Sequence, residues 1–308
     1  FILIILFNAS GSFAQKLSMA EAKHAGDSII PEAILPFWQS LTLKEKVAQT
    51  LMVYMPSASY IKKHQFGGVL IMKPHLKDTL HLKEELSLAN ESLKIPLLTA
   101  IDQEGGKVNR LQAISPEWKN LPSAKEMRTM TDDSVYNLAK QIGNALHHYG
   151  INLNLAPVLD PPKDSKGKPS FIEVSNRSFG EFETAVPKIR SFVKGMKESK
   201  VLSTSKHFPG YDSWTNSDHQ IAFSTSSKEI ILRNVELFKE FADEIPVVML
   251  SSVRFVRLSN TPAVFNPKIT AMAREISPYT VLLTDDLWGV SLRAWISGTD
   301  KVKRKNYP

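Results

Sequence analysis

Residues 96–111 read PLLTAIDQEGGKVNRL, an apolar run that passes directly into a charged loop containing two glycines. The run at 96–101 is short and apolar almost throughout, which predicts a β-strand covered on both faces, as in a parallel sheet. Six more runs of the same kind lie on either side of it, at residues 49–54, 68–72, 151–155, 201–205, 246–250 and 280–284. The repetition predicts a sheet of about seven buried strands.

Amphipathic stretches separate most of these runs, at residues 76–92, 133–149, 184–199 and 228–242. Each carries apolar residues at helical spacing and is long enough for a crossover helix. Alternating strands and helices favour an α/β fold with right-handed crossovers. The number of strands favours a TIM-type (β/α)8 barrel, with an open doubly wound sheet as the alternative.

The barrel is expected to be incomplete at its C-terminus, because an eighth strand is not evident in the sequence. The seventh strand ends at Thr284, and the residues that follow contain no convincing helix and strand. We therefore expect one barrel at residues 40–287 and an atypical basic tail at 288–308. An unpaired strand at the edge of the sheet would be a liability for stability and aggregation.

The composition excludes several classes of protein. Hydrophobic residues make up 43% of the 308 residues and charged residues 22%, which is typical of a globular chain. The net charge of +7 includes four basic residues in the last eight positions, so we predict no nucleic-acid partner. The absence of cysteine excludes disulfides, thiolate metal sites and a cysteine nucleophile.

The N-terminus begins with the apolar run FILIILF, followed by small residues that include Ser12 and Ala14. This pattern predicts part of a signal peptide at residues 1–14 and a lead-in segment at 15–39, with a frayed apolar terminus as the alternative. The run is too short for a stable membrane span, and no other segment approaches about 20 apolar residues. We therefore expect an exported protein, either periplasmic or secreted.

Polar residues follow four of the predicted strands, at the strand ends where a barrel of this type places its active site. Asp102 follows the run at 96–101, Asp160 the run at 151–155, Lys206 and His207 the run at 201–205, and Asp285 the last run. Each position has a plain alternative, such as a turn, a surface pair or a helix cap. Their recurrence at one end of one sheet indicates a functional site, because a desolvated charge is costly unless it is paired.

Six segments together resemble the N-terminal barrel domain of glycoside hydrolase family 3. They are FGGVLIM (66–72), PLLTAIDQEGGKVNRL (96–111), INLNLAPVLD (151–160), NRSFG (176–180), SKHFPG (205–210) and LTDDL (283–287). The similarity is greatest to the β-N-acetylglucosaminidase, or β-hexosaminidase, branch of bacterial cell-wall recycling. The resemblance implies a retaining exo-glycosidase that removes terminal β-linked N-acetylhexosamine from cell-wall or chitin-type glycans.

The resemblance also implies roles for particular residues. Asp285 falls on the nucleophile, and His219 falls on the loop histidine that acts as general acid/base, with Asp218 as the nearest carboxylate to orient it. Strand alternation places Asp286 on the side opposite Asp285. The implied sugar-binding residues are Asp102, Arg110, Arg177, Lys206, His207 and, as a weaker candidate, Asp160. The expected partner is a carbohydrate substrate, and neither a metal nor an organic cofactor is implied.

The sequence departs from the family in the acid/base loop. The family motif Asp-Ser-His is Ser217-Asp218-His219 here, and Tyr211-Asp212 replaces the usual His-Gly. These changes leave two alternatives open, a β-glucosidase-like member or a catalytically impaired barrel that binds glycans. The dissimilar tail fits a piece of a longer parent protein with a further C-terminal domain.

Overall fold

The computed structural model describes residues 2–3, 34–276 and 280–299. All seven predicted strands are confirmed. They are β2 (Leu51–Tyr54), β3 (Gly68–Ile71), β4 (Leu98–Ile101), β5 (Leu153–Asn154), β6 (Leu202–Phe208), β8 (Val247–Leu250) and β10 (Val281–Thr284).

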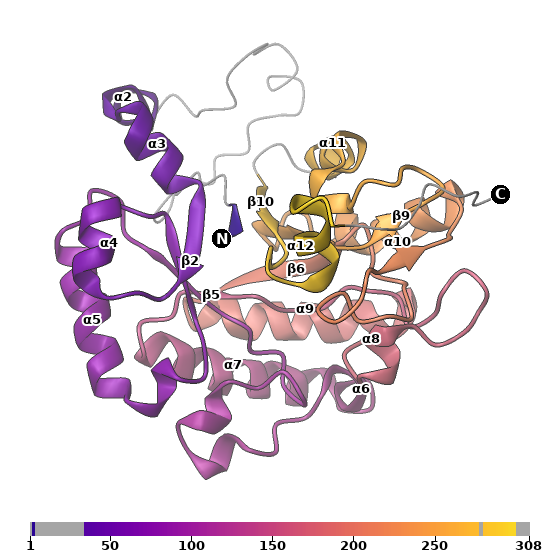
Figure 1. Cartoon of the computed structure of the whole chain (residues 1–308). Coiled ribbons are helices and arrows are strands. Elements are labelled where there is room, and N and C mark those ends of the chain that lie inside the picture. The colour runs from indigo at the N-terminus through magenta and orange to yellow at the C-terminus, as the bar shows by residue number, and fades with distance from the viewer. Residues whose placement is uncertain (1, 4–33, 277–279, 300–308) are drawn as a thin grey trace.

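These strands form one curled sheet in the order β2-β3-β4-β5-β6-β8-β10, with every neighbouring pair parallel (Figure 1). A short strand, β1 (Ile2–Leu3), pairs antiparallel with β2 at the open edge. Within the described residues no parallel strand follows β10, so the expectation of a TIM-type barrel that lacks its eighth strand is confirmed.

The four predicted crossover helices are also confirmed, as α5 (Thr79–Glu91), α7 (Asp132–His148), α9 (Phe182–Glu198) and α10 (Lys228–Glu240). Side-chain oxygens of Asp78, Thr131 and Ser227 accept hydrogen bonds from the first turns of α5, α7 and α10. Such caps satisfy backbone donors that have no partner inside the helix, and they fix where each helix begins.

Several shorter elements were not predicted from the sequence. The α-helices are α2 (Leu35–Ser40), α3 (Leu43–Gln49), α4 (Ala58–His64), α6 (Ala124–Met127), α8 (Phe171–Val174), α11 (Pro267–Ile276) and α12 (Val290–Ile296). The 3-10 helices are η2 (His75–Lys77), η3 (Leu111–Ala113), η4 (Pro116–Trp118) and η5 (Ala263–Phe265). Two short strands, β7 (Phe223–Ser224) and β9 (Arg254–Phe255), form a separate parallel pair.

Helix α12 follows β10, in the segment where the sequence predicts no convincing helix and strand, and within the described residues no strand comes after it. Its Leu292 is fully buried, and Ser291 Oγ donates to Ser252 O at 3.0 Å. A seven-residue helix with one buried apolar anchor leaves too weak a periodic pattern to be recognised in the sequence.

The core has two layers because side chains alternate along each strand. The inner layer lies inside the curled sheet and contains Met52, Leu70, Leu98, Ala100, Leu153, Leu155, Val247, Met249, Val281 and Leu283. The outer layer joins the other face of the sheet to the helices around it, as Ile101 from β4 and Ile189 from α9 illustrate. Residues two positions beyond an inner-layer residue therefore point toward the axis of the barrel.

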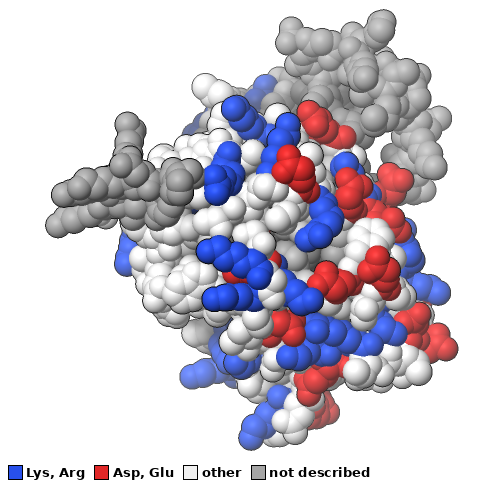
Figure 2. Space-filling model, turned by 90° about the vertical axis from the view of Figure 1, so that its right-hand side faces the viewer, with Lys and Arg blue, Asp and Glu red and all other residues white. Residues whose placement is uncertain are grey.

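The two ends of the chain lie largely outside the described residues. Apart from Ile2–Leu3, the expected signal peptide at 1–14 is not described, and neither are most of the lead-in segment or residues 300–308 of the basic tail. The domain boundaries therefore stay predictions. Among the described helices, none has both the length and the apolar character needed to cross a bilayer. On the face shown in Figure 2, basic and acidic side chains are interspersed.

Candidate active site

The register of the sheet brings Asp102, Lys206 and Asp285 to the same inner side. Asp102 lies two residues beyond the inner-layer Ala100, and Asp285 lies two residues beyond the inner-layer Leu283. Lys206 pairs with the inner-layer Met249 of β8, and neighbours across a parallel ladder point to the same face. Three chemically distinct groups from β4, β6 and β10 therefore meet at the carboxyl ends of the strands, where barrel enzymes place their sites.

An ion-pair network surrounds Glu104, which is almost completely buried. Its carboxylate accepts from Arg177 Nε and Nη2, both at 2.8 Å, and lies 2.6 Å from Lys206 Nζ. Lys206 Nζ also donates to Asp102 Oδ1 at 2.9 Å, and Arg110 Nη2 lies 3.8 Å from Asp102 Oδ2. The carboxylates from the loop after β4 thus hold three cationic side chains from separate segments at one site.

The ion pairs of this network shift the pKa values of its buried members, Glu104 and Lys206. Burial acts to raise the pKa of Glu104, but the Arg177 and Lys206 charges outweigh it and hold that pKa well below its usual value. Burial likewise acts to lower the pKa of Lys206, whereas Asp102 and Glu104 raise it above its usual value. The pKa of Arg177 is also raised above its usual value, because the charge of Glu104 outweighs burial, so Glu104, Lys206 and Arg177 are all charged at neutral pH.

His207 is held by Asp160, whose side chain has no exposure to solvent. Asp160 Oδ2 lies 2.6 Å from His207 Nδ1, and Oδ1 accepts from His207 N at 2.8 Å and from Tyr211 N at 2.6 Å. The register shift between Lys206 and Phe208 makes His207 the extra residue of a β-bulge, which re-aims side chains. Asp160 therefore holds His207 through both of its carboxylate oxygens, and a contact between Asp160 and sugar stays a prediction.

Asp285 and Asp286 follow β10 and have different partners. Ser252 Oγ donates to Asp285 Oδ2, and Asp286 N donates to Asp285 Oδ1 at 2.8 Å, so the half-buried Asp285 carboxylate is fixed on both oxygens. Asp286 Oδ2 instead accepts from Tyr54 Oη at 2.5 Å. Tyr54 belongs to β2, so this bond joins the first and last strands of the parallel sheet. As alternation predicts, the two carboxylates face different groups.

The loop after β6 is shaped by Tyr211 and Asn216. The buried Tyr211 hydroxyl donates to Thr215 O at 2.5 Å and accepts from Ser217 N at 2.8 Å. Asn216 accepts from three backbone amides, namely Asp218 N on its side chain and His219 N and Gln220 N on its carbonyl. These contacts form a tight turn in which Asp218 and His219 are exposed to solvent.

Sequence reasoning missed three residues of this site, Glu104, Tyr54 and Ser252. Glu104 had a sequence signal, since it follows Asp102 directly after a buried strand in the charged loop. Tyr54 and Ser252 had no local signal, because each matters through a contact with a residue more than 30 positions away. The predicted residues Asp102, Arg110, Arg177, Lys206 and His207 do converge.

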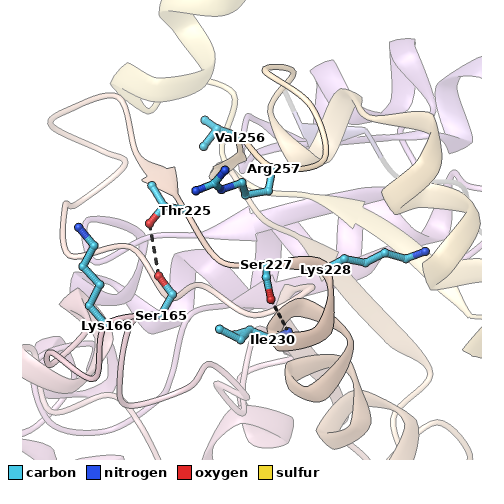
Figure 3. Close-up of a pocket in the computed structure, with 8 residues that line it drawn as sticks. All are labelled: Ser165, Lys166, Thr225, Ser227, Lys228, Ile230, Val256 and Arg257. Atoms are coloured by element: carbon cyan, nitrogen blue, oxygen red, sulfur yellow. Dashed lines mark hydrogen bonds between the residues drawn. The ribbon is translucent and has the colours of Figure 1, made fainter. Parts of the chain in front are cut away.

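A separate hollow of about 670 Å³ lies beside β7 and the start of α10 (Figure 3). It is lined by Ser165, Lys166, Thr225, Ser227, Lys228, Ile230, Val256 and Arg257. Ser165 Oγ and Thr225 Oγ1 lie 3.3 Å apart across it. None of the predicted site residues lines it. In the part of the chain that the structure describes, no three His, Cys, Asp or Glu side chains are grouped to hold a metal ion.

Comparison with known proteins identifies the family. The sequence model described as Glycosyl hydrolase family 3 N terminal domain matches residues 42–287. A Beta-hexosaminidase of Actinobacillus pleuropneumoniae is 28% identical over 208 residues, which cover 64% of this chain and 58% of that protein. Beta-hexosaminidase LpqI of Mycobacterium tuberculosis is 25% identical over 274 residues, which cover 82% of this chain and 67% of LpqI.

Solved structures agree with the sequence relatives. The β-N-acetylhexosaminidase of Beutenbergia cavernae has a TM-score of 0.72 and 25% identity, over 83% of this chain and 82% of that chain. The structure of M. tuberculosis LpqI has a TM-score of 0.73 and 25% identity, over 89% of this chain and 81% of that chain. The chain spans a little over half the length of the A. pleuropneumoniae relative. Because the family's sequence model covers most of its length, the chain belongs to glycosyl hydrolase family 3.

Proposed function

We propose that the chain is a retaining exo-glycosidase that removes terminal β-linked N-acetylhexosamine. The proposal rests on the orientation of Asp285. Its half-buried carboxylate lies at the end of β10 and accepts hydrogen bonds from Ser252 and from the Asp286 amide. It extends to the same inner side of the sheet as Asp102 and Lys206. A fixed carboxylate beside an array of hydrogen-bonding groups is the arrangement that nucleophilic attack on a bound sugar requires.

The proposed reaction has two steps. In the first, an Asp285 oxygen attacks the anomeric carbon, and the bond to the leaving oxygen breaks as that oxygen receives a proton. In the second, water attacks the glycosyl ester, gives up a proton and releases Asp285. The group that donates the first proton and accepts the second comes from the loop after β6, where Asp218 and His219 are the candidates.

The remaining polar groups would bind the sugar. Lys206 Nζ directs two of its three protons to Asp102 and Glu104, so it serves mainly to hold Asp102 in place as an acceptor for a sugar hydroxyl. Arg177 and Arg110 remain partly accessible, and these two side chains and the buried His207 would donate to hydroxyls or to the acetamido oxygen. The number of donors fixed before substrate arrives favours tight orientation of one terminal sugar.

The substrate class draws support from the relatives, two of which are named β-hexosaminidases and one a β-N-acetylhexosaminidase. We extend the proposal to cell-wall or chitin-type glycans, and to an exported chain, periplasmic or secreted, on the basis of the N-terminal apolar run. Because the chain spans only part of these relatives, a further domain of a longer parent protein is part of the proposal.

The test is hydrolysis of 4-nitrophenyl β-N-acetylglucosaminide by the purified chain and by Asp285→Asn. We expect activity in the wild type, release of the β-anomer first, and loss of turnover in the variant, with circular dichroism confirming that both are folded. The matched control is Asp133→Asn, which changes an exposed aspartate at the start of α7. Unchanged turnover in Asp285→Asn, or preferential hydrolysis of the aryl glucoside, would contradict the proposal.

A further inference from the structure

The Asp218 carboxylate does not orient the His219 imidazole in this structure. Among the described residues, no hydrogen bond or ion pair joins the two side chains, and none of those found involves the His219 ring. His219 is exposed to solvent, and its backbone N–H donates to Asn216 O at 3.2 Å. The inversion from Asp-Ser-His to Ser217-Asp218-His219 has therefore separated the carboxylate from the histidine that it would be expected to orient.

The backbone around Asp218 is instead bound to the segment that carries Asp285. Asp218 O accepts from Val290 N at 3.2 Å, and Ser217 O accepts from Ser291 N at 3.0 Å. Gly289 N in turn donates to Asp286 O at 3.2 Å. The loop after β6 and the turn after β10 thus form one hydrogen-bonded unit.

The side chain of Asp218 also lies against this turn. A Cβ atom at Gly289 would stand 3.3 Å from Asp218 Oδ1, so the carboxylate occupies space that a side chain at that position would crowd. Gly289 itself has an ordinary negative φ, and the absence of its side chain therefore matters for packing rather than for backbone freedom. The geometry directs the Asp218 carboxylate toward the residues that follow β10.

The electrostatic surroundings of Asp218 are those of the site. Burial is the main cause that raises the pKa of its carboxyl, followed by the negative charge of Asp285 and more weakly of Asp286. Arg177 and His207 oppose this and lower it. Asp218 is nonetheless an exposed residue, which a group that meets an incoming substrate must be. Burial is the main cause that raises the pKa of Tyr54 on β2, and the charge of Asp218 adds to it after those of Asp286 and Asp102.

From this arrangement we propose that Asp218, in place of His219, is the general acid/base of the chain. The inference rests on the proposed glycosidase function and assigns the proton transfer within it. A pair of carboxyl groups with different environments, one ionised and one protonated, is a general solution for glycoside hydrolysis. Here burial and then the negative charge of Asp285 raise the pKa of Asp218, which favours its protonated form, while Ser252 Oγ and Asp286 N donate to the Asp285 carboxylate.

The Asp218 carboxyl gives its proton to the glycosidic oxygen as the bond from that oxygen to the anomeric carbon breaks, and the bonding electrons leave with the oxygen. Asp285 forms the ester to the sugar in the same step. The Asp218 carboxylate then takes a proton from the attacking water, and the ester bond breaks to regenerate the Asp285 carboxylate.

The test compares Asp218→Asn with His219→Gln on two substrates. On chitobiose, whose leaving group needs a proton, we expect Asp218→Asn to lose about 10²–10⁴-fold in kcat/KM, the usual contribution of general acid catalysis. On a 2,4-dinitrophenyl glycoside, whose leaving group needs none, the first step should be largely spared. Added azide should restore turnover and yield the β-glycosyl azide. His219→Gln should stay within a few-fold of wild type on both substrates.

The pH profile supplies a second readout. The decline of kcat/KM at high pH should follow deprotonation of Asp218, and it should disappear in Asp218→Asn. A loss in His219→Gln with Asp218→Asn near wild type would overturn the assignment. So would an equal loss in Asp218→Asn on both substrates without azide rescue, since that pattern indicates a structural role. If the wild type hydrolyses neither substrate, the proposed function itself fails; if only Asp285→Asn is inactive, only this assignment fails.

Discussion

Replacement of Glu104 by Gln tests whether the buried ion pairs hold the site together. The substitution keeps the volume of the side chain but removes the charge that two cations share. Arg177 loses its bidentate partner, with both bonds at 2.8 Å, and Lys206 loses a contact at 2.6 Å. Lys206 is only 2% exposed but keeps Asp102 at 2.9 Å, so one cation is left unpaired rather than two.

The expected loss in the free energy of unfolding depends on how many buried cations lose their partner. Removing one member of a buried ion pair costs about 3–5 kcal/mol because the remaining charge is desolvated without compensation. Since Lys206 retains Asp102, we expect the lower end, about 3 kcal/mol. The matched control is Glu236→Gln, which breaks the pair with Lys239 at 2.7 Å. Both side chains of that pair are about half exposed, and its loss should cost at most about 1 kcal/mol.

The assay is urea unfolding followed by circular dichroism, at several pH values. The pKa of Glu104 is lowered in the folded state, so its contribution is fully present above its unfolded pKa of about 4.3 and is lost as the pH falls below that value. The difference between wild type and Glu104→Gln should therefore shrink in acid. A loss under 1 kcal/mol at pH 7, or a loss that is the same at pH 7 and pH 3, would refute the reasoning.

Three further predictions concern other contacts. Tyr54→Phe removes the hydroxyl that donates to Asp286, and it should lower the free energy of unfolding by about 1 kcal/mol. A double-mutant cycle with Asp286→Asn should show coupling between the two substitutions. Additive losses would mean that the hydrogen bond contributes nothing to stability. Gly195→Ala would place a Cβ atom 2.8 Å from Ala139 Cβ, where α9 packs against α7. Urea unfolding should show a free energy of unfolding that is lower by about 1–3 kcal/mol. An unchanged midpoint would show that the two helices can move apart without cost. Burial raises the pKa of Asp212, so the folded state holds its proton more tightly and loses stability as the pH rises through that pKa. Asp212→Asn should therefore be more stable than wild type at pH 7 but not at pH 3 in thermal unfolding, and a variant less stable at pH 7 would contradict this.

The order of strands and helices could be predicted from the amino-acid sequence alone, and so could the strand ends at which most candidate site residues lie. Seven apolar runs and four amphipathic stretches were sufficient, because a strand buried on both faces and a crossover helix each have a strong local pattern. The motifs from DQEGG at 102–106 to LTDDL at 283–287 also located Asp102, Lys206 and Asp285 at strand ends. Short elements such as α12 were missed because a single buried apolar residue cannot show the helical periodicity of a hydrophobic face.

The pairing of the site residues depends on long-range contacts that no local pattern in the sequence reveals. Asp160 and Asp102 are similar in sequence, each an aspartate shortly after a strand, yet one is fully buried beneath His207 and the other remains accessible beside Lys206. Likewise, the order Ser217-Asp218-His219 does not reveal which side chain turns toward Asp285. That direction is set by hydrogen bonds between the loop after β6 and the start of α12, about 70 residues apart along the chain. Local sequence fixes the backbone pattern, whereas burial and pairing depend on contacts between segments that meet only in the folded barrel.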